Sequence, residues 1–160
     1  MRKHLENGDH TGWFEELYAA VEGDPERIPW ADLVPNPNVT RYLDGEGIQG
    51  MGRKALKVGG GLGDDAEYLS RIGFRVLAFD VAPTSIAWCR RRFPHSKVNY
   101  TVGDLFQAPA QWRQAFEFVL ESYTLQVLPP QTRRTAMACI ARFLAPGGTL
   151  LVVARGREEG

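Results

Sequence analysis

The chain has 160 residues, enough for one domain with a buried core and too few for a separate substrate domain. Lysine plus arginine equal aspartate plus glutamate at 19 each, so the net charge gives no reason to expect nucleic acid or an anionic membrane as partner. No apolar run is long enough to cross a bilayer and the first residues are polar, so we expect a cytoplasmic protein.

The N-terminal third, residues 1–52, is predicted to form a helical cap and a connection. Thr11 is a plausible helix cap, and apolar side chains follow it at helical spacing up to Val21. A proline-rich stretch and a short helix over 39–43 come next, and a glycine-rich connection over 45–52 leads to the first strand.

Residues 53–160 alternate between short apolar runs and helical patterns, which is typical of parallel βαβ units with helices on both faces of the sheet. Strands are predicted over 55–58, 75–79, 98–102, 116–121 and 149–154. Helices are predicted over 64–72, 84–92 and 131–144, with a short turn at 111–113. The whole chain is therefore read as one α/β domain.

The two cysteines, Cys89 and Cys139, lie in amphipathic helical patterns without a second cysteine or histidine at a metal-ligand spacing. We expect buried free thiols and no metal site. The run Arg90-Arg91-Arg92 is expected at the solvated end of a helix, where cations suit the helix dipole.

The most informative stretch is Lys57-Val58-Gly59-Gly60-Gly61-Leu62-Gly63-Asp64-Asp65, which predicts a strand, a tight turn and a helix start. Glycine permits the positive-φ turn and the close approach of backbone N–H groups to a ligand. Asp80 closes the next strand, at the distance where a carboxylate can accept hydrogen bonds from both hydroxyls of a ribose.

Five features in this order resemble the class I S-adenosylmethionine-dependent methyltransferases, over about residues 55–154. They are the glycine turn, Asp80, Val102-Gly103-Asp104-Leu105, Phe116-Glu117-Phe118-Val119-Leu120 and Leu144-Ala145-Pro146-Gly147-Gly148. The resemblance implies a three-layer Rossmann-like fold with a parallel sheet of strand order 3-2-1-4-5. It also implies S-adenosylmethionine as cofactor and methyl transfer to a small molecule.

By the same resemblance, Gly59, Gly61 and Gly63 pack against the methionine part of the cofactor and Asp80 binds the ribose. Asp104 faces the adenine amino group beside Leu105, although it can equally cap the next turn. Asp65 is either a cofactor ligand or a first-turn residue that suits the helix dipole.

Acceptor contacts are expected just past the fourth strand and on the N-terminal cap. Tyr123 stands where this fold presents residues to the acceptor. Glu121 is an acid/base or a hydrogen-bonding partner of the cofactor or acceptor, or else a helix-capping or surface residue. Trp13 and Trp30 either lie over cofactor and acceptor or pack the cap onto the sheet. The N-terminal part resembles the thiopurine and halide/thiol methyltransferase branch, so a thiol or another soft nucleophile is the expected acceptor.

Two departures from the family pattern stand out. Lys57 occupies the place where most class I members carry an acid before the glycines, which predicts weakened cofactor binding. The chain also ends after strand 149–154, before the helix and two antiparallel strands that normally follow. We therefore expect an apolar sheet edge there and self-association, as a homodimer joined through that strand.

Two alternatives remain open. A nicotinamide-dependent oxidoreductase fits the glycine spacing formally, but Asp64 and Asp65 would face a pyrophosphate with the wrong charge. A non-catalytic module that keeps the methyltransferase architecture fits both Lys57 and the early chain end.

Overall fold

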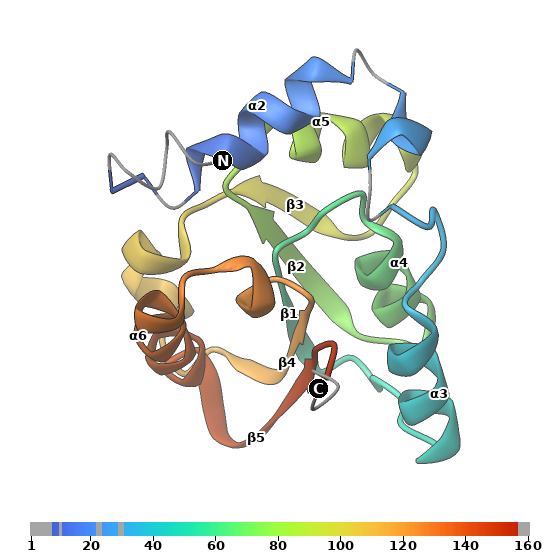
Figure 1. Cartoon of the computed structure of the whole chain (residues 1–160). Coiled ribbons are helices and arrows are strands. Elements are labelled where there is room, and N and C mark those ends of the chain that lie inside the picture. Colours follow the sequence, from blue (N-terminus) through green and yellow to red (C-terminus); the bar gives the residue numbers. More distant parts are fainter. Residues whose placement is uncertain (1–7, 10, 22–23, 29–30, 157–160) are drawn as a thin grey trace.

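Five parallel strands form the centre of the molecule in the computed structural model, which describes residues 8–9, 11–21, 24–28 and 31–156 (Figure 1). The strands are β1 (Lys54–Val58), β2 (Arg75–Asp80), β3 (Asn99–Val102), β4 (Phe116–Ser122) and β5 (Leu144–Val153). Their order is β3-β2-β1-β4-β5, and every neighbouring pair is parallel. The predicted fold class and strand order are therefore confirmed.

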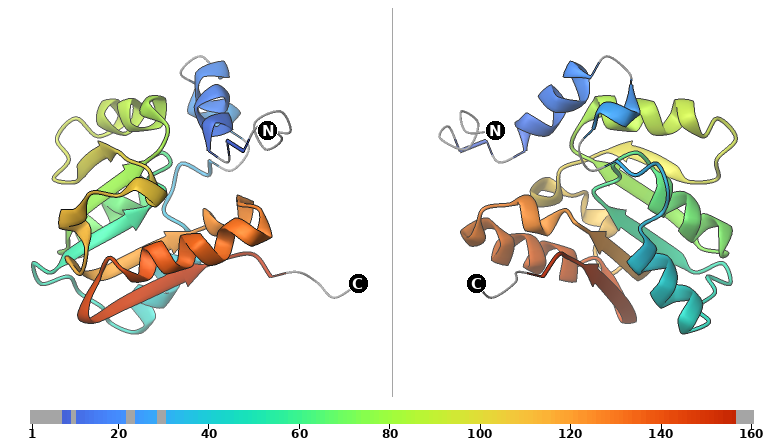
Figure 2. Two further views of the ribbon diagram at one scale, coloured as in Figure 1. Left: turned by 90° about the vertical axis from the view of Figure 1, so that its left-hand side faces the viewer. Right: turned by 45° about the vertical axis from the view of Figure 1, so that its right-hand side comes forward.

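Helices cover both faces of this sheet, because alternate side chains of each strand point to opposite sides. The helices α3 (Pro37–Gly45), α4 (Asp64–Arg71) and α5 (Pro83–Arg92) cover one face, and α6 (Pro130–Ala141) covers the other (Figures 1 and 2). On β1, for example, Ala55 packs in the cluster under α4, whereas Leu56 packs in the cluster under α6.

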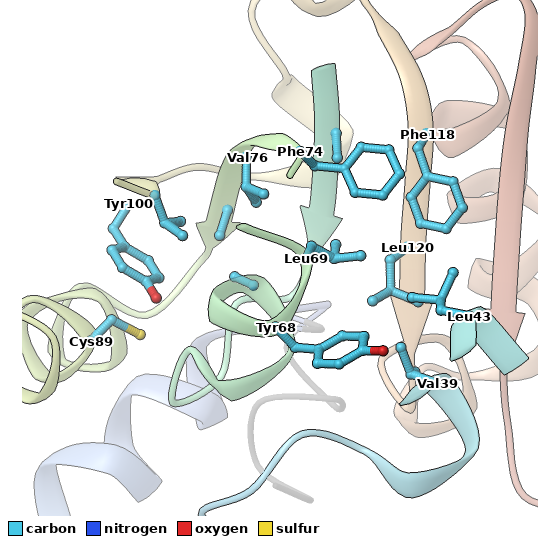
Figure 3. Packing of buried hydrophobic residues seen from close by; sticks show 14 of the residues in the cluster. Val39, Leu43, Tyr68, Leu69, Phe74, Val76, Cys89, Tyr100, Phe118 and Leu120 are labelled. Carbon is cyan, nitrogen blue, oxygen red and sulfur yellow. The ribbon is translucent and has the colours of Figure 1, made fainter. Parts of the chain in front are cut away.

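The core under α3 and α4 is built from side chains of several elements (Figure 3). The rings of Phe74 and Phe118 lie side by side, 5.0 Å apart, next to Leu69 of α4 and Leu120 of β4. Burying an aliphatic side chain of this size contributes about 2 kcal/mol relative to leaving it in water. These contacts fix the strand ends that carry the loops described below.

The helix α2 (Gly12–Ala20) packs against α5 rather than against the sheet (Figures 1 and 2). Tyr18 meets Trp88 edge-on, with ring centroids 6.0 Å apart. The Glu15 carboxylate accepts hydrogen bonds from the Thr84 hydroxyl and, at 3.0 Å, from the Thr84 backbone N–H in the first turn of α5. One carboxylate therefore caps α5 and anchors α2.

The connection from α6 to β5 differs from the prediction. The helix ends at Ala141 rather than at residue 144, and the strand begins at Leu144 rather than at residue 149. Phe143 is the reason, because its ring packs against Phe79 and Trp112 in the core and cannot stay on the helix. A register shift opposite Phe116 and Phe118 absorbs the extra strand residues.

The strand β5 lies at one edge of the sheet, and Val152 on it is 38% exposed. The expected self-association through this edge stays a prediction. Four short 3₁₀ turns complete the described elements: η1 (Pro25–Arg27), η2 (Leu105–Gln107), η3 (Ala110–Trp112) and η4 (Leu125–Val127). Within the described ranges, no helix combines the length and apolarity that a membrane span needs.

We predict that Glu15→Ala lowers the free energy of unfolding by about 1–2 kcal/mol, because the first turn of α5 loses its acceptor and its favourable charge. Hydrogen exchange should rise in α2 before it rises in the sheet. Glu46→Ala is the control, since Glu46 is exposed and its carboxylate forms no hydrogen bond with the described residues. Equal stability of the two variants would contradict the anchoring role.

Candidate functional site

The glycine turn that follows β1 is held against the end of β2. Gly59, Gly61 and Gly63 have φ values of 66°, 54° and 95°, in the region that favours glycine. The Gly60 N–H donates to the Phe79 carbonyl at 2.7 Å. A Cβ on Gly59 would lie 2.2 Å from Thr124 Oγ1, so the turn has no room for a side chain there. The expected tight turn is thus present, and its residues are buried or half-buried.

Asp80 lies beside this turn and binds it. Its Oδ2 accepts from the Gly61 N–H and its Oδ1 from the Ala82 N–H, both at 3.0 Å. Burial raises the pKa of this carboxyl above its ordinary value, while the two N–H groups and the charge of Lys57 oppose that rise. A carboxylate oxygen accepts more than one hydrogen bond, so both oxygens retain acceptor capacity.

Lys57 lies almost fully buried at the end of β1, with 3% of its surface exposed. Its Nζ donates to the carbonyls of Val58 at 2.8 Å and Gly59 at 2.7 Å. These carbonyls belong to the turn, so the ammonium takes part in fixing its shape. The residue that departs from the family pattern thus has a structural function of its own.

Asp104 and Asp65 are both engaged with protein donors. Asp104 caps η2, its Oδ1 accepting from the Phe106 N–H at 2.9 Å. Asp65 accepts from the Asn36 N–H at 2.7 Å and from the Ser122 hydroxyl at 2.6 Å. It therefore ties the segment before α3 to the end of β4.

Tyr123 directly follows β4 and is one of few non-glycine residues with positive φ, at 62°. Such a conformation in a bulky residue costs on the order of 1 kcal/mol and is commonest at functional sites. Its backbone N–H donates to the Val153 carbonyl at 2.9 Å. The guanidinium of Arg155 lies over its ring, 5.4 Å from the centroid.

Glu121 is fully buried and does not border the cavity described below. Its Oε1 accepts from the backbone N–H groups of Thr124 at 2.6 Å and Leu125 at 2.9 Å, and its Oε2 has no hydrogen-bond partner among the described residues. This placement corresponds to the capping alternative, because the carboxylate holds the first turn of η4.

A cavity of about 510 Å³ brings most of these residues together at the carboxyl ends of the strands. Its volume suits a ligand the size of a small cofactor. Its wall includes Lys57, Gly59, Gly61, Gly63, Asp65, Asp80, Asp104, Leu105, Tyr123 and Arg155. Within the described ranges, no cluster of three histidine, cysteine or acidic side chains is arranged to hold a metal ion.

The N-terminal part contributes different aromatic residues from those expected. Phe14 and Tyr18 of α2 border the cavity, whereas Trp13 is buried outside its wall and stacks on Phe14 at 3.9 Å. Trp30 lies outside the described residues. Positions 14 and 18 share one helix face, whereas position 13 shares a face with position 17. Helical spacing separates the two pairs but does not show which pair borders the cavity.

Comparisons with known proteins agree with this architecture. The model of the methyltransferase domain family matches residues 55–148. Carboxy-S-adenosyl-L-methionine synthase of Chromohalobacter salexigens is 30% identical over 106 residues, covering 64% of this chain and 36% of that protein.

Solved structures resemble more of the chain. One solved structure concerns the conversion of a disulfide bond into a thioacetal group during echinomycin biosynthesis. Its sequence is 26% identical to this chain and the TM-score is 0.75, over 89% of this chain and 57% of that one. The N-methyltransferase NodS of Bradyrhizobium japonicum, in complex with S-adenosyl-L-homocysteine, is 25% identical with a TM-score of 0.65, over 85% of this chain and 71% of that one. The chain thus spans about a third of the curated relative and somewhat over half of the first structure.

We predict that Lys57→Met lowers the free energy of unfolding by about 1–3 kcal/mol, because two buried carbonyls lose a charged donor. Lys54→Met is the matched control on the same strand, since Lys54 is exposed. Chemical denaturation of both variants measures the difference. Lys57→Met as stable as the control would show that the ammonium does not hold the turn.

The two cysteines differ, contrary to the expectation that both are buried: Cys89 is buried and Cys139 is half-buried. Burial raises the pKa of the Cys89 thiol to about 12. We predict that iodoacetamide at pH 8 modifies Cys139 in the folded protein and leaves Cys89 intact until denaturant is added, because this pKa cuts the thiolate fraction on the order of a thousandfold. Peptide mapping after timed labelling gives both rates, and similar rates would contradict the burial.

Proposed function

The chain belongs to the methyltransferase domain family, and from this premise we propose that it binds S-adenosylmethionine in the cavity and transfers its methyl group to a small molecule. The observation that carries the proposal is the conjunction of the glycine turn and Asp80 on one cavity wall. A ribose needs a carboxylate with free acceptor capacity, and an extended ligand chain needs backbone without side chains. Asp80 and the glycine turn meet these two requirements side by side, since the Asp80 Oδ2 lies 3.0 Å from the Gly61 nitrogen.

Each wall of the cavity has a distinct part in this proposal. Asp80 holds the ribose hydroxyls, Gly59 and Gly61 border the methionine part, and Leu105 offers an apolar face to the adenine beside Asp104. Lys57 keeps the turn in shape through the carbonyls that it binds. Gly63, as the N-cap of α4, starts the helix in the left-handed region and borders the same wall.

The chemistry asks little of the protein beyond position and exclusion of water. S-adenosylmethionine, when bound, supplies a methyl group activated by a sulfonium. With a thiol acceptor, a sulfur–carbon bond forms as the carbon–sulfonium bond breaks, the thiol proton passes to solvent, and S-adenosylhomocysteine is left. Phe14, Tyr18 and Tyr123 border the space where this occurs, and aromatic faces favour a nearby cation.

We further propose a thiol or similar soft nucleophile as acceptor, as in the thiopurine and halide/thiol branch. Such an acceptor needs no protein base, which agrees with the placement of Glu121 away from the cavity. The structure related to echinomycin biosynthesis concerns chemistry at sulfur and resembles most of this chain. Glu121 then acts as a positioning residue, through the η4 turn, and Tyr123 as the acceptor contact.

We predict that calorimetric titration shows micromolar binding of S-adenosylmethionine and S-adenosylhomocysteine, and that Asp80→Ala weakens both by about ten- to a hundredfold through lost hydroxyl contacts. Asp24→Ala is the matched control, because Asp24 caps the exposed η1 turn outside the cavity wall. Asp80→Asn retains the size of the side chain and removes its charge. If this variant folds and still binds more weakly, the loss belongs to binding and not to folding.

Thermal unfolding gives an independent readout, since a ligand that binds only the folded state raises the midpoint. A wild-type protein whose midpoint neither ligand shifts would contradict the proposal and favour a non-catalytic module with the same architecture. Binding that Asp80→Ala leaves unchanged would place the ribose elsewhere in the cavity.

A further inference from the structure

Arg155 borders the cavity two residues after the end of β5, which is separated from β1 and its glycine turn by β4. It is exposed, yet its position is fixed at two points. Its backbone N–H donates to Gln126 Oε1 at 2.9 Å, and its guanidinium lies 5.4 Å from the centroid of the Tyr123 ring. Stacking of this kind orients the guanidinium plane and leaves its N–H donors free at the edges.

Tyr123 is itself held in place for this contact. Its left-handed backbone, with φ of 62°, is stabilised by the hydrogen bond from its N–H to Val153 at 2.9 Å. The Asn38 side-chain amide lies 3.5 Å from the Tyr123 hydroxyl. The ring, the amide and the guanidinium therefore form one polar group at the end of β4 and β5.

The charge of Arg155 is not balanced by an acid in the described part of the chain. Four carboxylates of the cavity wall already accept hydrogen bonds from protein donors: Asp64, Asp65, Asp80 and Asp104. Asp32 is an exposed carboxylate on the wall and forms no ion pair with Arg155 within the described residues. Lys57, the other cation of the wall, is committed to two carbonyls. Arg155 is left to face an anion from outside.

We propose that Arg155, oriented by Tyr123, binds a carboxylate of the methyl acceptor, so that the acceptor is a small anionic molecule. The proposal rests on the proposed function, because the acceptor subsite is defined by methyl transfer in this cavity. A guanidinium is suited to this task since it pairs with both oxygens of a carboxylate at once. The subsite makes Arg155 a residue that determines specificity and that takes no part in breaking or forming bonds.

The test compares thiols of similar size and different charge: 3-mercaptopropionate, the neutral 2-mercaptoethanol and the cationic cysteamine. With S-adenosylmethionine, we expect kcat/KM to be about tenfold higher for the anionic thiol than for the neutral one, as one charge-assisted contact implies. Arg155→Gln should remove this preference by raising KM for 3-mercaptopropionate, with little change in kcat. Arg155→Lys should restore part of the preference, because it keeps the charge and loses the planar pair.

Arg134→Gln is the matched control, since Arg134 is exposed on α6 and does not border the cavity. The same thiols are titrated calorimetrically into the protein saturated with S-adenosylhomocysteine, which measures the subsite without turnover. Equal affinity for the anionic and neutral thiols, no affinity for either, or a preference that survives Arg155→Gln overturns the proposal. If S-adenosylhomocysteine itself does not bind, the proposed function fails first, and the first titration of the series reveals it.

Discussion

The fixed conformation of the glycine turn is the constraint on which the rest of the site depends. Two hydrogen bonds tie the turn to the end of β2: Gly60 N–H to the Phe79 carbonyl at 2.7 Å and Gly61 N–H to the Asp80 carboxylate at 3.0 Å. A turn of glycines has large conformational entropy when free, and these contacts offset the cost of ordering it. The acid that a ligand would contact thus also prepares the backbone that the ligand would approach.

Lys57 extends the same arrangement from the other side of the turn. An acid at this position would repel the carbonyls of Val58 and Gly59, whereas the ammonium binds both. The departure from the family pattern therefore does not imply a damaged turn. It replaces one way of fixing the loop by another, because two of the three donors of the ammonium bind protein carbonyls.

The central strands, the glycine turn and Asp80 were predictable because each follows from residues adjacent in the sequence: apolar runs for the strands, glycines for the turn and an acid at a strand end. The role of Glu121 was also within reach. On β4, Val119 and Glu121 share a face by strand alternation. Val119 packs in the cluster under α6, so the Glu121 side chain is expected on that buried face of the sheet. The end of α6 was not predictable from its own residues, since a contact between Phe143 and side chains distant in sequence decides it. The same holds for Asp65, whose partners Asn36 and Ser122 come from separate segments.

The distribution of charge divides the cavity into two parts with different requirements. The ends of β1, β2 and β3 carry carboxylates that are already hydrogen-bonded, and with Phe14 and Tyr18 they favour a ligand with hydroxyls and a cation. The ends of β4 and β5 carry the Tyr123 ring and the Arg155 guanidinium, which has no acidic partner among the described residues and favours an anion. A cationic donor and an anionic acceptor bound side by side would attract each other. The positive φ of Tyr123 agrees with the proposed function, because this residue lies between the two parts of the cavity wall.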